Sequence, residues 1–181
     1  MHAGLIGCCI LLGFWMNLAA AQNNDSDPAD TLSSEMTYSL NTGSFIYHAY
    51  SPQRDFLQYF DNRVIALERR IENPYIDSLV VGSGLNSHGN RCLMLGVQKD
   101  WIQYDDRLSF EGVYAYAGEF FFDAFSHCGD AGFYNNVRDI TGVGFTFYIY
   151  HGLEYDVNRH LSLEAGAALP GIVVLSLQWH F

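Results

Sequence analysis

Apolar and polar residues alternate with a period of two along most of the chain, which is the pattern of half-exposed β-strands. The C-terminal segment shows this most clearly, because large apolar residues occupy one face and polar or smaller residues the other. The first face carries Val173, Leu175, Leu177, Trp179 and Phe181, and the second carries Val174, Ser176, Gln178 and His180. Segments 107–120, 143–155 and 161–168 repeat the pattern.

Eight such segments are present, each close to the length that a tilted strand needs to cross a bilayer. They cover residues 42–50, 60–71, 76–86, 91–101, 107–121, 140–155, 160–168 and 171–181. An apolar, aromatic outer face with a polar inner face is typical of membrane barrels. The pattern therefore predicts an all-β fold, an eight-stranded antiparallel up-and-down outer-membrane β-barrel over residues 42–181. A soluble lipocalin-like barrel is the alternative, but inner-face residues such as Glu111 and Gln178 favour lipid outside.

The N-terminal segment has the character of a secretory signal peptide. Residues 1–21 contain no Asp, Glu, Lys or Arg, include a long hydrophobic run, and end in three alanines. We expect cleavage after Ala21, with a membrane anchor as the less favoured alternative because the run is short for a spanning helix. The polar, acidic residues 22–41 are expected to form a loose lead-in. The final Phe181 resembles the terminal signal of bacterial outer-membrane proteins, which is therefore the expected location.

An even number of strands returns both chain ends to the periplasmic side of such a barrel. The outer connections are then expected at residues 51–59, 86–91, 122–139 and 168–171. Removal of the signal peptide leaves two cysteines, Cys92 and Cys128, and both lie near these outer connections. Because exported proteins meet oxidising conditions, this pair is a candidate disulfide.

The composition narrows the range of functions. Charged residues make up only 16% of the chain, against about 25% in typical globular proteins. The net charge of −11 argues against a nucleic-acid partner, which requires a basic face. We expect no metal ligands among the scattered histidines, which are His88, His127, His151, His160 and His180. A closed barrel has no free edge strand, so we expect a monomer.

Candidate chemistry lies at the outer rim, because an eight-stranded barrel holds at most one small ligand inside. His48 ends the first predicted strand, and Asn86, Ser87 and His88 belong to the second outer connection. A histidine that activates a hydroxyl is the usual arrangement for acyl transfer. On spacing alone, ordinary surface loops explain these residues more simply.

Two outer-loop motifs carry a family resemblance. Segment 47–50 (Tyr-His-Ala-Tyr), followed by 59–63 (Tyr-Phe-Asp-Asn-Arg), resembles the first outer loop of PagP, the outer-membrane lipid A palmitoyltransferase family. Segment 85–91 (Leu-Asn-Ser-His-Gly-Asn-Arg) lies where that family has an Asp-Ser pair before a glycine-rich strand. The resemblance implies that His48 and Ser87 match the family's essential histidine and serine. Asn86 then replaces an aspartate, and an amide can orient a group but cannot act as a base.

The resemblance implies an acyltransferase that moves a fatty acyl chain, palmitoyl in the family, from a phospholipid donor to lipid A without cofactor or metal. His48 would activate the acceptor hydroxyl, while Asn86 and Ser87 would position groups or stabilise the oxyanion. Arg63 and Arg91 would pair with lipid phosphates.

The barrel interior would receive the acyl chain. Small residues such as Ala115, Ala117 and Gly144 would give it room, and Gln98 falls where the family has a glycine at the pocket floor.

Two alternative functions stay open. One is a non-enzymatic small outer-membrane barrel whose outer loops bind a partner or stiffen the envelope. The other, less favoured, is a lipid A deacylase of the PagL type.

Overall fold

The structure, a computed structural model, describes residues 36–49 and 59–181. The predicted signal peptide at 1–21, most of the predicted lead-in at 22–41 and most of the first outer connection at 51–59 lie outside the described residues. No helix in the described part combines the length and apolar character needed to cross a membrane.

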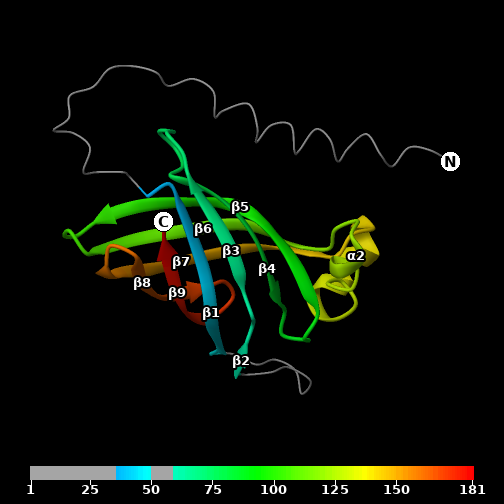
Figure 1. Ribbon diagram of the computed structural model, residues 1–181. Coiled ribbons are helices and arrows are strands. Elements are labelled where there is room, and N and C mark those ends of the chain that lie inside the picture. Colours follow the sequence, from blue (N-terminus) through cyan, green and yellow to red (C-terminus); the bar gives the residue numbers. More distant parts are fainter. Residues whose placement is uncertain (1–35, 50–58) are drawn as a thin grey trace. The chain divides into compact units, whose positions relative to one another are not determined.

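The described strands form one antiparallel sheet that closes into a barrel (Figure 1). Each strand pairs with its neighbours in sequence, and the first and last strands pair to close the sheet. The strands are β1 (Tyr38–His48), β2 (Tyr59–Asp61), β3 (Ile65–Arg70), β4 (Ser78–Leu85), β5 (Arg91–Gln103), β6 (Leu108–Gly118), β7 (Phe145–Asn158), β8 (Leu161–Ala168) and β9 (Ile172–His180). Because β2 and β3 are two pieces of one strand along β1, the predicted eight-stranded up-and-down barrel is confirmed.

The second predicted strand is interrupted by a bulge between β2 and β3. Gly43 and Arg63 face this interruption with left-handed backbone conformations, φ 66° and 46°. The Asn62 side chain stabilises it, because its Oδ1 accepts hydrogen bonds from the Ser44 hydroxyl and from the main-chain N–H of Val64, the latter at 3.2 Å. Pairing with β1 therefore breaks just below the end of the barrel.

Two other boundaries differ from the prediction. β1 begins at Tyr38, inside the predicted lead-in. The sixth predicted strand, 140–155, begins too early, because residues Gly132–Thr141 form helix α2 after a short 3-10 helix, η1 (Asp123–Phe125). Gly142 ends α2 with φ 84°, and its N–H donates to the Arg138 carbonyl at 2.7 Å. Alternation in β7 continues by chance into the end of this helix, which explains the error.

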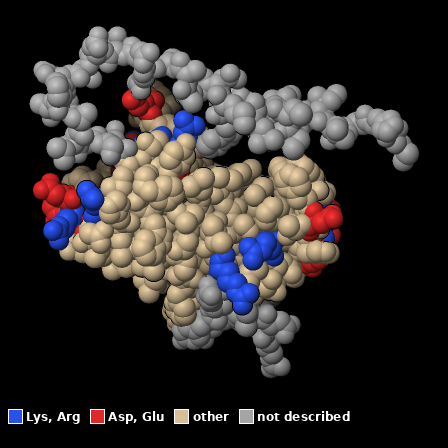
Figure 2. Space-filling model, in the orientation of Figure 1, with Lys and Arg blue, Asp and Glu red and all other residues tan. Residues whose placement is uncertain are grey.

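Apolar residues cover the outside of the barrel and polar residues fill much of its inside. Phe147 is 69% exposed on the outer face, whereas Glu111 and Gln178 on the inner face are 2% and 3% exposed. Figure 2 shows a broad surface free of Lys, Arg, Asp and Glu, with charged groups gathered toward its margins. A soluble barrel would have the opposite arrangement, so the distribution favours a lipid-facing exterior.

His151 is a polar residue on this apolar face, and neighbouring aromatic residues hold it there. Its Nε2 lies 2.7 Å from the Tyr114 hydroxyl, which also accepts a hydrogen bond of 3.1 Å from Trp101 Nε1. The imidazole stacks against Phe110 with ring centroids 5.9 Å apart. The Trp101 N–H, the Tyr114 hydroxyl and His151 Nε2 thus satisfy one another without water.

The two ends of the barrel differ in their connections. The end that carries residues 86–90, 119–144 and 169–171 is called the loop end here, and the end that carries Phe181 and the turns 71–77 and 104–107 is called the terminal end. The predicted tight connection at 168–171 is present between β8 and β9.

Candidate functional site

A cavity of about 1030 Å³ extends from the loop end into the barrel. Its walls are largely apolar and include Ile46, Val80 and Val174. Deeper in the barrel the lining becomes polar at Glu68 and Glu164. The volume is at the upper limit of typical ligand sites, which span about 300–1000 Å³. The chain therefore encloses an apolar space large enough for a substantial ligand.

A polar layer closes the bottom of this cavity. Each of its three buried glutamates, Glu68, Glu111 and Glu164, accepts a hydrogen bond from a neutral side chain. The donors are Gln178 to Glu68 at 3.1 Å, Gln98 to Glu111 at 3.2 Å, and Ser176 and Asn41 to Glu164, both at 2.8 Å. Because interlocking side chains fill the lumen at this level, the cavity is open toward the loop end.

Three of the predicted site residues meet on the cavity wall. His48, at the end of β1, is 4% exposed and pairs across the barrel seam with Ile172. Asn86 and Ser87 lie in the turn that follows β4, and both line the same cavity. The sequence motifs thus identified residues that are distant along the chain and share one space.

Other expectations about the cavity are wrong in detail. Ala117 lines it, but Ala115 and Gly144 are absent from its lining. Gln98 also lies outside the lining, because its side chain bonds Glu111 within the polar layer beneath. Glu68 and Glu164 line the cavity floor, where the family resemblance had implied Gln98.

Asn86 holds the second loop together. Its Oδ1 accepts hydrogen bonds from the main-chain N–H groups of His88 and Asn90, both at 3.0 Å. Its Nδ2 donates to the Cys128 carbonyl at 3.1 Å, which ties the turn to the long third loop. Both ends of the amide are therefore occupied within the protein, which fits the first of the two roles expected for Asn86, the positioning of neighbouring groups.

Asn86→Asp is expected to destabilise the loop end by about 2 kcal/mol, because a carboxylate oxygen would face the Cys128 carbonyl in place of a donor. Urea titration of the folded barrel in lipid vesicles would measure the loss. Asn158→Asp is the matched control, because its Oδ1 only accepts, from His160 N–H at 2.9 Å. Equal effects of the two substitutions would contradict the assignment.

The long third loop packs over the cavity through two anchors. One is the disulfide between Cys92 on β5 and Cys128, the pair that the sequence proposed, with Cα atoms 5.0 Å apart. The other is Glu119, which forms an ion pair with Arg138 and accepts main-chain hydrogen bonds from Gly129 at 3.2 Å and Gly144 at 2.5 Å. Helix α2, which follows Cys128 in the chain and precedes β7, supplies part of the cavity wall.

Tyr134 is the α2 residue with the clearest chemical consequence. Its side chain lines the cavity, and burial raises its pKa to about 12. The phenol is therefore protonated at neutral pH and can donate a hydrogen bond to a ligand.

Glu119→Ala is expected to destabilise the loop end by about 3 kcal/mol, because the partly buried Arg138 guanidinium and the main-chain N–H groups of Gly129 and Gly144 lose their partner. Limited proteolysis should then cleave segment 122–144 faster than in the parent. Glu72→Ala, an exposed position in a turn at the terminal end, is the control. An unchanged cleavage rate in Glu119→Ala would show that Glu119 does not hold the loop.

The predicted phosphate-binding arginines lie outside the cavity. Arg91 alternates along β5 with the buried Cys92, so its side chain is on the outer face, where Nη1 donates to the Ser83 hydroxyl at 3.1 Å. Arg63 is exposed at the bulge, also near the loop end. Neither residue lines the cavity, so their predicted role applies to lipid headgroups at the barrel's edge.

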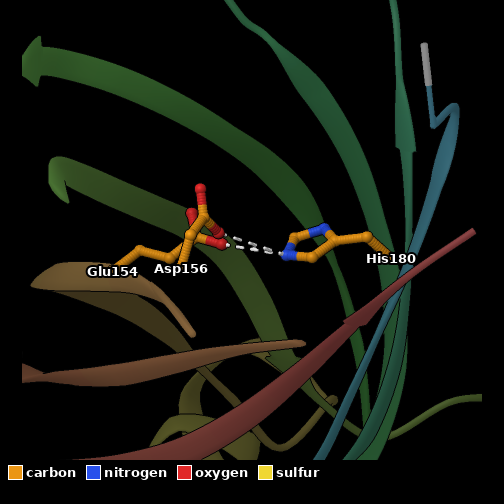
Figure 3. A group of neighbouring side chains, drawn as sticks. All are labelled: Glu154, Asp156 and His180. Carbon is orange, nitrogen blue, oxygen red and sulfur yellow. Dashed lines mark ion pairs between the residues drawn. The ribbon is translucent and has the colours of Figure 1, made fainter. Parts of the chain in front are cut away.

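Sequence reasoning missed a polar cluster at the terminal end. Glu154, Asp156 and His180 offer ligand atoms that lie within 4.8 Å of one another, although no metal ligand was expected at His180. Figure 3 shows the imidazole pointing toward both carboxylates. Alternation placed His180 on the inner face, but Asp156 lies beyond the predicted strand 140–155, and only the pairing of β8 with both β7 and β9 brings the three residues together.

Comparisons with known proteins support the fold. No family model and no curated protein matches the chain. A solved structure described as "De novo design of transmembrane beta-barrels" is similar with a TM-score of 0.52 and 13% sequence identity, over 81% of this chain and 96% of that one. At this identity the likeness concerns the fold alone, and it identifies a β-barrel of the transmembrane type.

Proposed function

We propose that this transmembrane barrel is an outer-membrane acyltransferase that moves a fatty acyl chain from a phospholipid to lipid A. The observation that carries the proposal is the cavity, whose apolar walls suit a hydrocarbon chain and whose lining includes His48 and Ser87. Burial of each methylene group in such a space contributes about 0.8 kcal/mol, so a long acyl chain would be held firmly.

The chemistry requires a base near the mouth and donors for the developing oxyanion. His48 would accept the proton of the acceptor hydroxyl as its oxygen attacks the acyl carbon. It would return that proton to the glycerol oxygen as the donor ester bond breaks and the lysophospholipid leaves. The Ser87 hydroxyl and the protonated Tyr134 phenol, which line the same cavity, are donors of the kind that stabilise an oxyanion. Asn86 would keep Ser87 in place through the turn that it organises.

Arginines at the loop end suit the lipid substrates. Arg91 and Arg63 lie at the outer face and at the exposed bulge, where phosphate groups of phospholipid and lipid A would meet the protein. Arginine pairs with phosphate through two parallel hydrogen bonds, which would orient the headgroup while the chain enters the cavity.

A second candidate is a barrel that binds a lipid or another apolar ligand without chemical change. The observation that favours it is Asn86, whose side chain is engaged within the protein at the position where the PagP family has an aspartate.

Mass spectrometry of lipid A would test the proposal. A Gram-negative host expressing the parent protein is expected to gain one acyl chain on lipid A, and a host expressing no barrel is not. Folding in the outer membrane is checked by the heat-dependent mobility of the barrel in gels. Unchanged lipid A from folded protein would contradict acyl transfer and support the binding candidate, and loss of an acyl chain would indicate a deacylase.

A further inference from the structure

The cluster at the terminal end combines one imidazole and two carboxylates. His180 Nε2 lies 3.3 Å from Glu154 Oε1 and 3.9 Å from Asp156 Oδ1. Ligands bound at about 2.0–2.1 Å to a tetrahedral metal ion are separated by roughly 3.3 Å. The His180–Glu154 separation matches this value, and small side-chain movements would bring the third donor, which lies within 4.8 Å of the other two, to the same spacing.

Neighbouring side chains already orient these donors. Ser39 Oγ lies 3.0 Å from His180 Nδ1, so Nδ1–H can donate to it and leave Nε2 free to bind a metal. The Ser162 hydroxyl lies 2.5 Å from Asp156 Oδ1 and 2.6 Å from His180 Nε2. Outer partners of this kind are typical of metal sites, where they fix the tautomer and the direction of each ligand. A bound ion would replace the Ser162–His180 contact.

The described side chains around the cluster supply oxygen atoms and no competing buried cation. Three glutamates are buried in the polar layer next to the cluster, and no Lys or Arg is among the buried side chains of the described residues. Gln178, directly opposite Ser162 on the neighbouring strand, is 3% exposed, and its Oε1 has no hydrogen-bond partner among the described residues. The amide oxygens of Asn41 and Gln98 in the polar layer lack a partner among the described residues in the same way, so this layer offers acceptors to water, including water bound to a neighbouring cation.

The cluster is also reachable. The Asp156 side chain is 43% exposed at the terminal end, whereas those of Glu154 and His180 are 16% and 19% exposed. An ion can therefore enter from the aqueous side without passing through the cavity or the polar layer.

We propose that Glu154, Asp156 and His180 form a binding site for one divalent transition-metal ion at the terminal end of the lumen. A donor set of one imidazole and two carboxylates suits Zn²⁺ or Mn²⁺, because it mixes the nitrogen and oxygen ligands that these ions accept. The site is independent of the proposed acyl transfer, because it lies on the other side of the polar layer.

Zinc binding by the untagged barrel, refolded from residues 22–181, would test this proposal. Isothermal titration with Zn²⁺ is expected to give one ion per chain, and Zn²⁺ should raise the unfolding temperature. His180→Ala is expected to abolish binding and Asp156→Asn to weaken it at least about 10-fold. Asp106→Asn, the same chemical change at an exposed turn of the same end, should bind as the parent does.

Each variant is first shown to be folded by its heat-dependent gel mobility. Where His180→Ala fails this check, Asp156→Asn against Asp106→Asn decides the question. Absence of zinc binding by the folded parent would overturn the proposal. Zinc binding that stays unchanged in both His180→Ala and Asp156→Asn would also overturn the proposal, because the ion would then be held elsewhere.

Discussion

His48→Ala is expected to lower the rate of acyl transfer at least about 100-fold while the barrel stays folded. The imidazole lines the cavity and matches the histidine that is essential in the PagP family, and alanine removes its proton-accepting nitrogen. The assay follows transfer from a phospholipid with a labelled chain to lipid A in detergent micelles. His127→Ala, a histidine exposed on the long loop, is the matched control and should keep full activity.

Ser87→Ala completes this test. If Ser87 donates to the oxyanion, its loss should lower the rate without changing the affinity for the donor lipid. Full activity in both His48→Ala and Ser87→Ala would mean that the reaction, if any, takes place away from this wall of the cavity.

Ala66→Phe is expected to shift acyl-chain preference toward shorter chains and to slow transfer of long chains at least about 10-fold. Ala66 is buried on β3 and lines the cavity two residues before Glu68, so a phenyl ring there would occupy its lower part. Ala165→Phe makes the same change on the outer face of β8 and should leave chain preference as it is. Competition between phospholipids of different chain length, followed by mass spectrometry, measures the shift.

An unchanged preference in folded Ala66→Phe would show that the chain lies elsewhere. The result would also separate the two candidate functions, because a pure binding protein would show altered chain affinity without any transferred product.

The barrel was predictable because a membrane-spanning strand must alternate apolar residues facing lipid with small or polar residues facing the lumen. Along β9 and β6 each outward position is apolar and most inward positions are small or polar, with Ile172, Val174 and Val113 at the apolar cavity as exceptions, so the number of strands followed from alternation. Helix α2 was missed because it is short and contains Asn135, Asn136 and Asp139, which are poor helix formers. Spaced apolar residues at Phe133, Val137 and Ile140 were the available signal.

The site was predictable only in part. The two loop motifs indicated His48 and Ser87 as site residues, and both line the same cavity in the fold. The role of Asn86 depended on the Cys128 carbonyl, which lies on a loop far along the chain, and no local pattern encodes that contact. The terminal cluster depended on strand register, which alternation does not determine between β7 and β9.

The hydrogen-bonded glutamates beneath the cavity bear on permeability. Glu68, Glu111 and Glu164 bond amide and hydroxyl groups inside a barrel of eight strands, which is narrow enough for side chains to fill, so we expect no continuous aqueous path between its two ends. The protein should therefore conduct no ions across a planar bilayer. Anything that enters from the loop end must also leave by it, so traffic through this barrel is confined to one leaflet and its adjoining water.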